Sequence, residues 1–164
     1  MSLLPEPAPD FSDPIGMLKA CHLRMLEHCE LLEKIDAHIQ TNGLDKEAVE
    51  AAQKAYRYFS TAAHHHHMDE EEDIFPWVPD FALLDELLAQ HKIINELWEA
   101  LEPALSGLAE GENCNAFGEL IKPFVATYRE HIEIEDTQVI PKAAFILNSE
   151  QLKEIGQHMQ ERRA

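Results

Sequence analysis

Two segments of the chain repeat one arrangement of histidine, glutamate and proline at identical offsets. In each copy the glutamate follows the histidine by four residues and the proline follows the glutamate by six: His66, Glu70 and Pro76 in the first copy, and His131, Glu135 and Pro141 in the second. Residues four apart on an α-helix lie one turn apart on the same face. The repeat therefore predicts two helices that each direct an imidazole and a carboxylate towards the same side.

A further helical segment, with one histidine on its apolar face, precedes each copy. His22 lies 44 residues before His66, and His91 lies 40 residues before His131. We therefore expect two helical hairpins joined by short connections, which favour antiparallel neighbours. The predicted fold is all-α, an antiparallel up-down-up-down four-helix bundle with a short C-terminal helix. Approximate two-fold symmetry would bring the histidines and glutamates to one level of the core.

Capping residues, glycines and prolines place the limits of these helices. We expect helices over about residues 14–42, 45–75, 81–102 and 116–140, and a short helix that begins at a Ser149 cap. A proline inside a helix removes one backbone donor and crowds the preceding turn. Pro103 is therefore expected to kink or end the third helix, Pro123 to kink the fourth or delay its start, and Pro141 to end it.

The N-terminal residues 1–12 contain Pro5, Pro7 and Pro9 and are predicted to form a flexible arm without helix. They lack the basic start and the apolar stretch of a secretory signal peptide. Residues 13–164 are expected to form one domain, a size that can bury a substantial core. No apolar run approaches the roughly 20 residues that a membrane-spanning helix requires.

The charge balance is strongly acidic, with 31 Asp and Glu against 13 Lys and Arg and a formal net charge of −18. Such a charge repels phosphate backbones and anionic lipid surfaces, so neither nucleic acid nor a membrane is an expected partner. The three cysteines, Cys21, Cys29 and Cys114, form no Cys-x-x-Cys pair. Neither a disulfide framework nor a thiolate zinc site is indicated, and a reducing cytoplasm is the expected location.

Imidazole and carboxylate together form a donor set that suits iron, manganese or zinc. Bundles of the di-iron carboxylate class build their sites from glutamates and histidines at short helical spacings on facing helices. Four imidazoles and two bridging carboxylates would serve two metal ions, each with two histidines and one oxygen of each glutamate. With a bridging oxo or hydroxo group, each octahedral ion would keep one open position.

The chain resembles the hemerythrin-like, or HHE cation-binding, family. The resemblance rests on four segments that together reach from about residue 13 to residue 142: LKACHLRML, HHHHMDEEEDIFP, LLAQHKIINEL and YREHIEIEDTQVIP. It implies a bundle that holds two non-haem iron ions, bridged by an oxo or hydroxo group. The implied ligands are His22, His66, His91 and His131, with Glu70 and Glu135 as the bridging ligands.

Two positions bear on the type of hemerythrin. The oxygen carriers have a second histidine one turn after the ligand of the third helix, but Asn95 stands there, four residues after His91. In this respect the chain is similar to iron-centre-repair proteins and iron-sensing hemerythrin domains, which use four histidines and two glutamates. The carriers also have an aspartate at the position of Asp136. Glu135 and Asp136 are therefore alternative bridging ligands, and the offset shared with Glu70 favours Glu135.

Four consecutive histidines, His64 to His67, precede the first glutamate. Four successive residues cover all sides of a helix, so at most two of them can face the core. His66 has the matching glutamate. We interpret His64, His65 and His67 as surface residues or as neighbours of the ligands.

Three functions agree with these features. The predicted one is a di-iron protein that reacts with or senses O₂, peroxide or nitric oxide, with redox turnover as an open question. The second is an iron-binding sensor or store without turnover. The third is a structural bundle that holds zinc or no metal, and the buried donors argue against it because such groups are costly unless coordinated or hydrogen-bonded.

Overall fold

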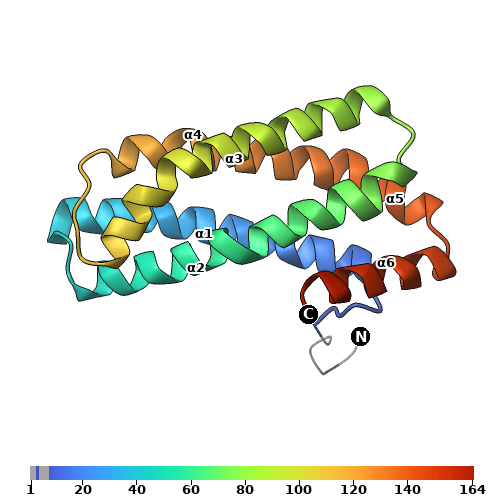
Figure 1. The fold of residues 1–164 in the computed structure, drawn as a ribbon, viewed down its shortest axis with the longest axis horizontal. Coiled ribbons are helices and arrows are strands. Elements are labelled where there is room, and N and C mark those ends of the chain that lie inside the picture. Colours follow the sequence, from blue (N-terminus) through green and yellow to red (C-terminus); the bar gives the residue numbers. More distant parts are fainter. Residues whose placement is uncertain (1–2, 4–7) are drawn as a thin grey trace.

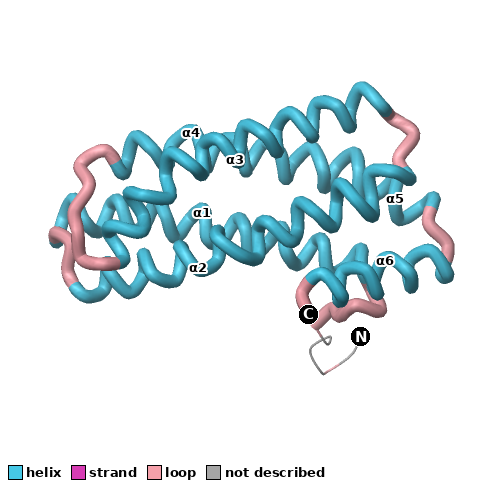
Figure 2. The backbone as a smooth tube through the Cα atoms, in the orientation of Figure 1, coloured by secondary structure: helices cyan, strands magenta, loops and turns pink. Residues whose placement is uncertain are grey.

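Four long helices form the body of the protein in the computed structural model, which describes residue 3 and residues 8–164. They are α1 (Pro14–Asn42), α2 (Lys46–Met68), α3 (Phe81–Ala109) and α4 (Phe117–Ile134). Each successive pair packs together, and α4 packs back against α1, which closes the bundle (Figure 1). Short loops separate the helices (Figure 2). The prediction of an antiparallel all-α bundle is confirmed.

Aspartate and asparagine side chains fix where the helices begin. The carboxylates of three aspartates accept hydrogen bonds from backbone N–H groups in the first turns of α1, α2 and α3: Asp13, Asp45 and Asp80. The first two caps agree with the sequence prediction. The predicted Ser149 cap is wrong, because Asn148 caps α6 (Ser149–Arg162) in a reciprocal arrangement with Gln151. Each of these caps satisfies a backbone donor that the helix itself leaves unpaired.

α2 and α4 each pass into a wider π-helical turn, which the sequence analysis did not predict. These turns are η1 (Asp69–Ile74) and η3 (Glu135–Val139). Pro76 follows the first turn within the short 3-10 helix η2 (Phe75–Trp77), and Pro141 follows the second in α5 (Ile140–Ile146). The segment expected to be helical from about 45 to 75 is helical, but it changes from an α-helix to a π-helix at Asp69. The expectation that Pro141 ends the fourth helical segment is wrong.

The two prolines explain the position of the π turns. A proline ring clashes with the carbonyl group four residues earlier and offers that group no N–H donor. The affected carbonyls belong to Glu72 and Thr137, and both lie inside the π turns. Widening the helix at these points relieves the clash, so the helical path continues to Ile146 after the second proline.

α3 continues to Ala109, beyond the expected end near residue 102. Pro103 lies inside the helix, and the C-terminal end of α3 bends away from the line of the rest (Figure 1). Leu101, Leu105 and Leu108 on this final part are fully buried. Burial of a leucine side chain contributes about 1.5–3 kcal/mol, and this packing offsets the hydrogen bond lost at the proline.

The apolar core consists of two clusters with a polar layer between them. Met25, Ile94 and Tyr128 belong to the larger cluster, and Leu18 and Leu87 belong to the smaller one. On α1 and on α3 a buried histidine lies between a residue of the smaller cluster and a residue of the larger cluster. The predicted site therefore lies in the interior, covered by hydrophobic side chains at both ends.

The segment before α1 lies beside α6 (Figure 1). Of the predicted N-terminal arm, residues 1–2 and 4–7 lie outside the described residues, and residues 8–12 contain no helix. The carbonyl oxygen of Phe11 approaches α6 so closely that a Cβ atom at Gly156 would lie 1.9 Å from it. A glycine is therefore needed at this point of α6. No helix in the described part of the chain is long and apolar enough to cross a membrane.

Candidate metal centre

The structure brings all six sequence-predicted side chains together in the polar layer. They come from four helices and the two π turns, and none is more than 2 % exposed: His22 on α1, His66 on α2, Glu70 on η1, His91 on α3, His131 on α4 and Glu135 on η3. Both glutamates lie within π turns, which are frequent at functional sites. The repeated sequence unit is therefore also a repeated structural unit.

Each glutamate faces histidines from both helical hairpins. Glu70 Oε1 lies 3.1 Å from Nε2 of His66 and 3.6 Å from Nε2 of His91. Glu135 Oε2 lies 3.2 Å from Nε2 of His22, and its Oε1 lies 3.6 Å from Nε2 of His91 and also contacts His131. Both carboxylates therefore lie between the two histidine pairs, which is the position that a bridging ligand requires.

The donor atoms fall into two groups of four, each of which fits within 4.8 Å. One group contains His22, His66, Glu70 and Glu135, and the other contains His67, Glu70, His91 and His131. Glu70 belongs to both groups, and Glu135 also contacts both histidines of the second hairpin. The arrangement can hold two cations side by side.

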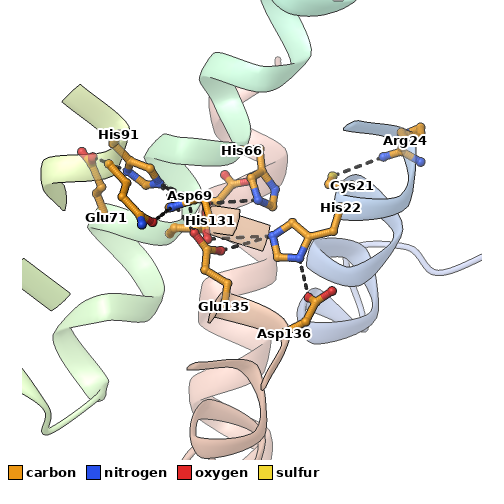
Figure 3. Close-up of polar contacts among 12 residues, drawn as sticks. Cys21, His22, Arg24, His66, Asp69, Glu71, His91, His131, Glu135 and Asp136 are labelled. Atoms are coloured by element: carbon orange, nitrogen blue, oxygen red, sulfur yellow. Dashed lines mark hydrogen bonds and ion pairs between the residues drawn. The ribbon is translucent and has the colours of Figure 1, made fainter. Parts of the chain in front are cut away.

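The outer ring nitrogens of three histidines have hydrogen-bond acceptors. Nδ1 of His22 lies 2.6 Å from Asp136, that of His91 lies 2.7 Å from Glu71, and that of His131 lies 2.8 Å from Gln90. An Nδ1–H group that donates outwards leaves the Nε2 lone pair facing the centre, which is the usual arrangement of a metal-binding histidine. Figure 3 shows His22 between Glu135 on one side and Asp136 on the other.

Glu135 and Asp136, the two alternatives of the sequence analysis, occupy different places. Glu135 is fully buried between the histidines, whereas the Asp136 side chain is 43 % exposed and lies behind His22. Glu135, and not Asp136, therefore lies among the histidines together with Glu70.

Several buried donor and acceptor atoms have no hydrogen-bond partner within the described residues. Apart from one nitrogen of His67, they all belong to the predicted ligands: Nε2 of His22, both ring nitrogens of His66, Oε1 of Glu70 and both carboxylate oxygens of Glu135. An unsatisfied buried polar group costs about 1–3 kcal/mol. Cations bound among these atoms would satisfy them together, so the donor set fits a metal centre.

In the metal-free protein, protons balance part of the negative charge. Burial disfavours the ionised form of Glu70, but the positive charge of the nearby His66 and His91 imidazoles outweighs burial and holds the pKa of Glu70 well below its usual value. Burial also opposes protonation of His66, but the charge of Glu70 raises the His66 pKa to about 10. Burial lowers the pKa of His131 to about 3. The centre therefore attracts positive charge.

The C-terminal helix holds the π turn that carries Glu70. Asp69, directly before this glutamate, is fully buried, and its Oδ2 accepts a hydrogen bond of 2.6 Å from Arg163. Arg162 also bonds to Asp69 and to Asp73, the latter at 3.0 Å. These ion pairs join residues about 90 positions apart, so no local sequence pattern could predict them.

His67 is a buried neighbour of the predicted ligands, which is one of the two places that the sequence analysis allowed it. It is 7 % exposed, and its ring stacks on that of His91 with 4.1 Å between the centroids. His64, by contrast, is exposed and His65 is partly exposed. His67 lies three residues before Glu70, which is also a same-face spacing on a helix. That spacing is the sequence feature that places His67 on the side of Glu70.

Comparison with known proteins agrees with this centre. The sequence profile of the hemerythrin HHE cation binding domain matches residues 13–143, which include all six predicted ligands. An uncharacterized protein of Haemophilus influenzae is 31 % identical over 166 residues, which cover 98 % of this chain and 96 % of that protein. With a matching profile over most of its length and a buried His/Glu centre, the chain belongs to the hemerythrin HHE cation-binding domain family.

Proposed function

We propose that the centre binds two iron ions and that, in its reduced form, it reacts with or senses O₂, peroxide or nitric oxide. The observation that carries this proposal is the position of Glu70 and Glu135, each between histidines of both hairpins. A carboxylate at such a position can use one oxygen for each of two ions. A pair of ferrous ions supplies two electrons to a small oxidant.

The protein residues contribute ligands, orientation and exclusion of bulk water. His22 and His66 would hold one ion, and His91 and His131 would hold the other. Asp136, Glu71 and Gln90 fix the orientation of three of these imidazoles through their Nδ1 atoms. The two apolar clusters on either side keep bulk water from the centre.

A purely structural role for zinc is the weaker alternative. A structural zinc site has four protein ligands in a closed tetrahedron. Here six donor side chains lie together, and the two carboxylates lie between two pairs of histidines. An iron sensor or store would use the same six ligands, and the reaction with oxygen separates it from the proposed function. The free thiols of Cys21, Cys29 and Cys114 agree with a reducing compartment, and we propose the cytoplasm.

Asn95 determines the kind of reaction that we expect. The side chain at this position is exposed, and an amide is a weak ligand, so it does not occupy a coordination position as a fifth histidine would. Both ions would then keep an exchangeable position. Two exchangeable positions favour irreversible oxidation over reversible oxygen carriage.

Stopped-flow absorption spectroscopy tests this function. The protein is loaded with iron, reduced without oxygen and mixed with oxygenated buffer. We expect oxidation within seconds to minutes, and a spectrum that does not return to the reduced form under vacuum. Full return under vacuum would indicate an oxygen carrier, and no oxidation over hours would indicate a store. Asn95→His should slow the oxidation while both irons are retained.

A further inference from the structure

A cavity of about 160 Å³ lies between α2, α3 and α4. Its lining includes the exposed residues Ser60, His64 and Asn95 and the buried residues His67 and Tyr128. The cavity therefore leads from the surface to His67, whose ring stacks on that of the predicted ligand His91. It is smaller than the roughly 300–1,000 Å³ of sites for drug-sized molecules. At about 30 Å³ for each water molecule in the liquid, it has room for a few waters or one small ligand.

His67 connects this cavity with the centre. Its ring stacks on His91, and one of its ring nitrogens lies within 4.8 Å of donor atoms of Glu70 and His131. Its Nε2 atom is buried and has no hydrogen-bond partner within the described residues. Since an unsatisfied buried nitrogen is costly, a partner that is not part of the chain would explain it.

The ring geometry argues against His67 as a further metal ligand. The planes of His67 and His91 differ by only 20°, and the centroids are 4.1 Å apart. A ring nitrogen offers its lone pair in the ring plane, so two rings stacked face to face cannot both direct lone pairs at one ion. His67 is instead placed to contact a molecule beside the ion held by His91 and His131.

We propose that the cavity admits the small ligand of the centre and that His67 forms a hydrogen bond with it. This inference rests on the proposed di-iron function and specifies its substrate class. The ligand is a small molecule with an acceptor atom that carries negative charge at the metal, such as peroxide or azide. A neutral imidazole carries one N–H group that can donate to such an atom. The cavity excludes larger organic substrates.

The test uses azide, a small anion that binds ferric iron with a change in absorption. The whole iron-loaded protein, oxidised in air, is titrated with azide, and the iron content of each variant is measured. In His67→Phe, a flat ring can still stack on His91 but has no nitrogen. Loss of one hydrogen bond to a charged acceptor is worth about 1.5–3 kcal/mol, so azide should bind at least about tenfold more weakly, while two irons are retained.

Two further variants and one control sharpen the result. His67→Gln keeps an N–H donor and should recover part of the affinity. Ser60→Trp narrows the outer part of the cavity and should slow azide association. His65→Phe is the matched control, because His65 belongs to the same histidine run but does not line the cavity, and its azide affinity should match that of the unaltered protein.

The outcomes separate the inference from the function on which it rests. Unchanged azide affinity in His67→Phe, with two irons bound, would overturn the role of His67. Loss of one iron in that variant would also overturn it and make His67 a ligand. An unaltered protein that binds no iron would instead overturn the proposed function. Unchanged association in Ser60→Trp would show that the ligand enters elsewhere.

Discussion

His22 and Asp136 lie on different helical segments, yet Nδ1 of the imidazole and Oδ1 of the carboxylate are only 2.6 Å apart. The same imidazole faces Glu135 with its other nitrogen, at 3.2 Å. Two adjacent carboxylates therefore contact opposite sides of one histidine. This relationship assigns them different roles, with Glu135 as a proposed bridging ligand and Asp136 as the group that orients His22.

Glu135 and Asp136 can be distinguished by substitution. We expect Glu135→Ala to lose the two-iron centre, because it removes the carboxylate shared by both histidine pairs. Asp136→Ala should keep the irons but hold them about 10- to 100-fold more weakly, the usual effect of losing a partner that orients a metal-bound histidine. Iron content after dialysis and chelator competition measure both effects.

Glu133→Ala is the control for these variants, because Glu133 is exposed at the end of α4, two residues before Glu135. It should bind iron as the unaltered protein does. Two irons in Glu135→Ala together with none in Asp136→Ala would reverse the assignment.

Removal of iron should destabilise the fold. Without metal the core holds several buried polar atoms that have no partner. A ligand present at about 1,000 times its Kd stabilises the folded state by about 4 kcal/mol, which corresponds to roughly 8–16 °C in Tm for a chain of this size. Calorimetry of the loaded and metal-free forms tests this expectation. Coincident melting curves after verified metal removal would count against a buried centre.

Metal affinity should rise with pH. Despite its burial, the pKa of His66 is raised to about 10 by the charge of Glu70, so this imidazole is protonated in the metal-free protein at neutral pH. A metal must displace that proton, so affinity should increase by about tenfold per pH unit for each proton released. His131, with a pKa of about 3, has no proton to release. Anaerobic ferrous titrations from pH 6 to pH 9 measure the slope, and a flat profile would contradict this expectation.

The C-terminal arginines should be needed to retain iron. Replacing Arg162 and Arg163 with alanine leaves the buried Asp69 without its partners, and breaking a buried ion pair in this way costs about 3–5 kcal/mol. We expect a lower midpoint in urea and faster loss of iron to a chelator, because Asp69 precedes Glu70 on the same π turn. Lys153→Ala, at an exposed position on the same helix, is the control. Equal rates of iron loss in the double-arginine variant and in Lys153→Ala would show that the ion pairs of these arginines with Asp69 do not support the metal centre.

The bundle and the placement of the six donors could be predicted because they depend on periodicity. A histidine and a glutamate four residues apart share a helix face whatever surrounds them, and the repeated offset of Glu70 and Glu135 indicated a symmetric core. Asp13 and Asp45 were recognisable as caps because a cap is a local interaction between a side chain and the next turn.

The features that the sequence did not predict are of two kinds. Some depend on an alternative to the regular α-helix, and others depend on contacts between residues that are distant in the sequence. Pro76 and Pro141 are both expected to end helices. Only Trp77 of a short 3-10 helix follows Pro76, whereas after Pro141 the helical path continues to Ile146, because a widened π turn relieves the clash of the proline ring. The sequence left two places open for His67, at the surface or beside the ligands, because its packing on His91 depends on a separate helix. The ion pair between Asp69 and Arg162 joins residues 93 positions apart in the sequence, and no local pattern predicts such a pair.

The central claim is that six buried side chains hold two iron ions, and metal analysis with an absorption spectrum of aerobically purified protein tests it most directly. We predict about two irons per chain, near-ultraviolet bands typical of an oxo-bridged ferric pair, and loss of both when Glu70 or Glu135 is replaced with alanine. Stoichiometric zinc, or a protein that is colourless and stays free of metal after ferrous loading, would contradict the account.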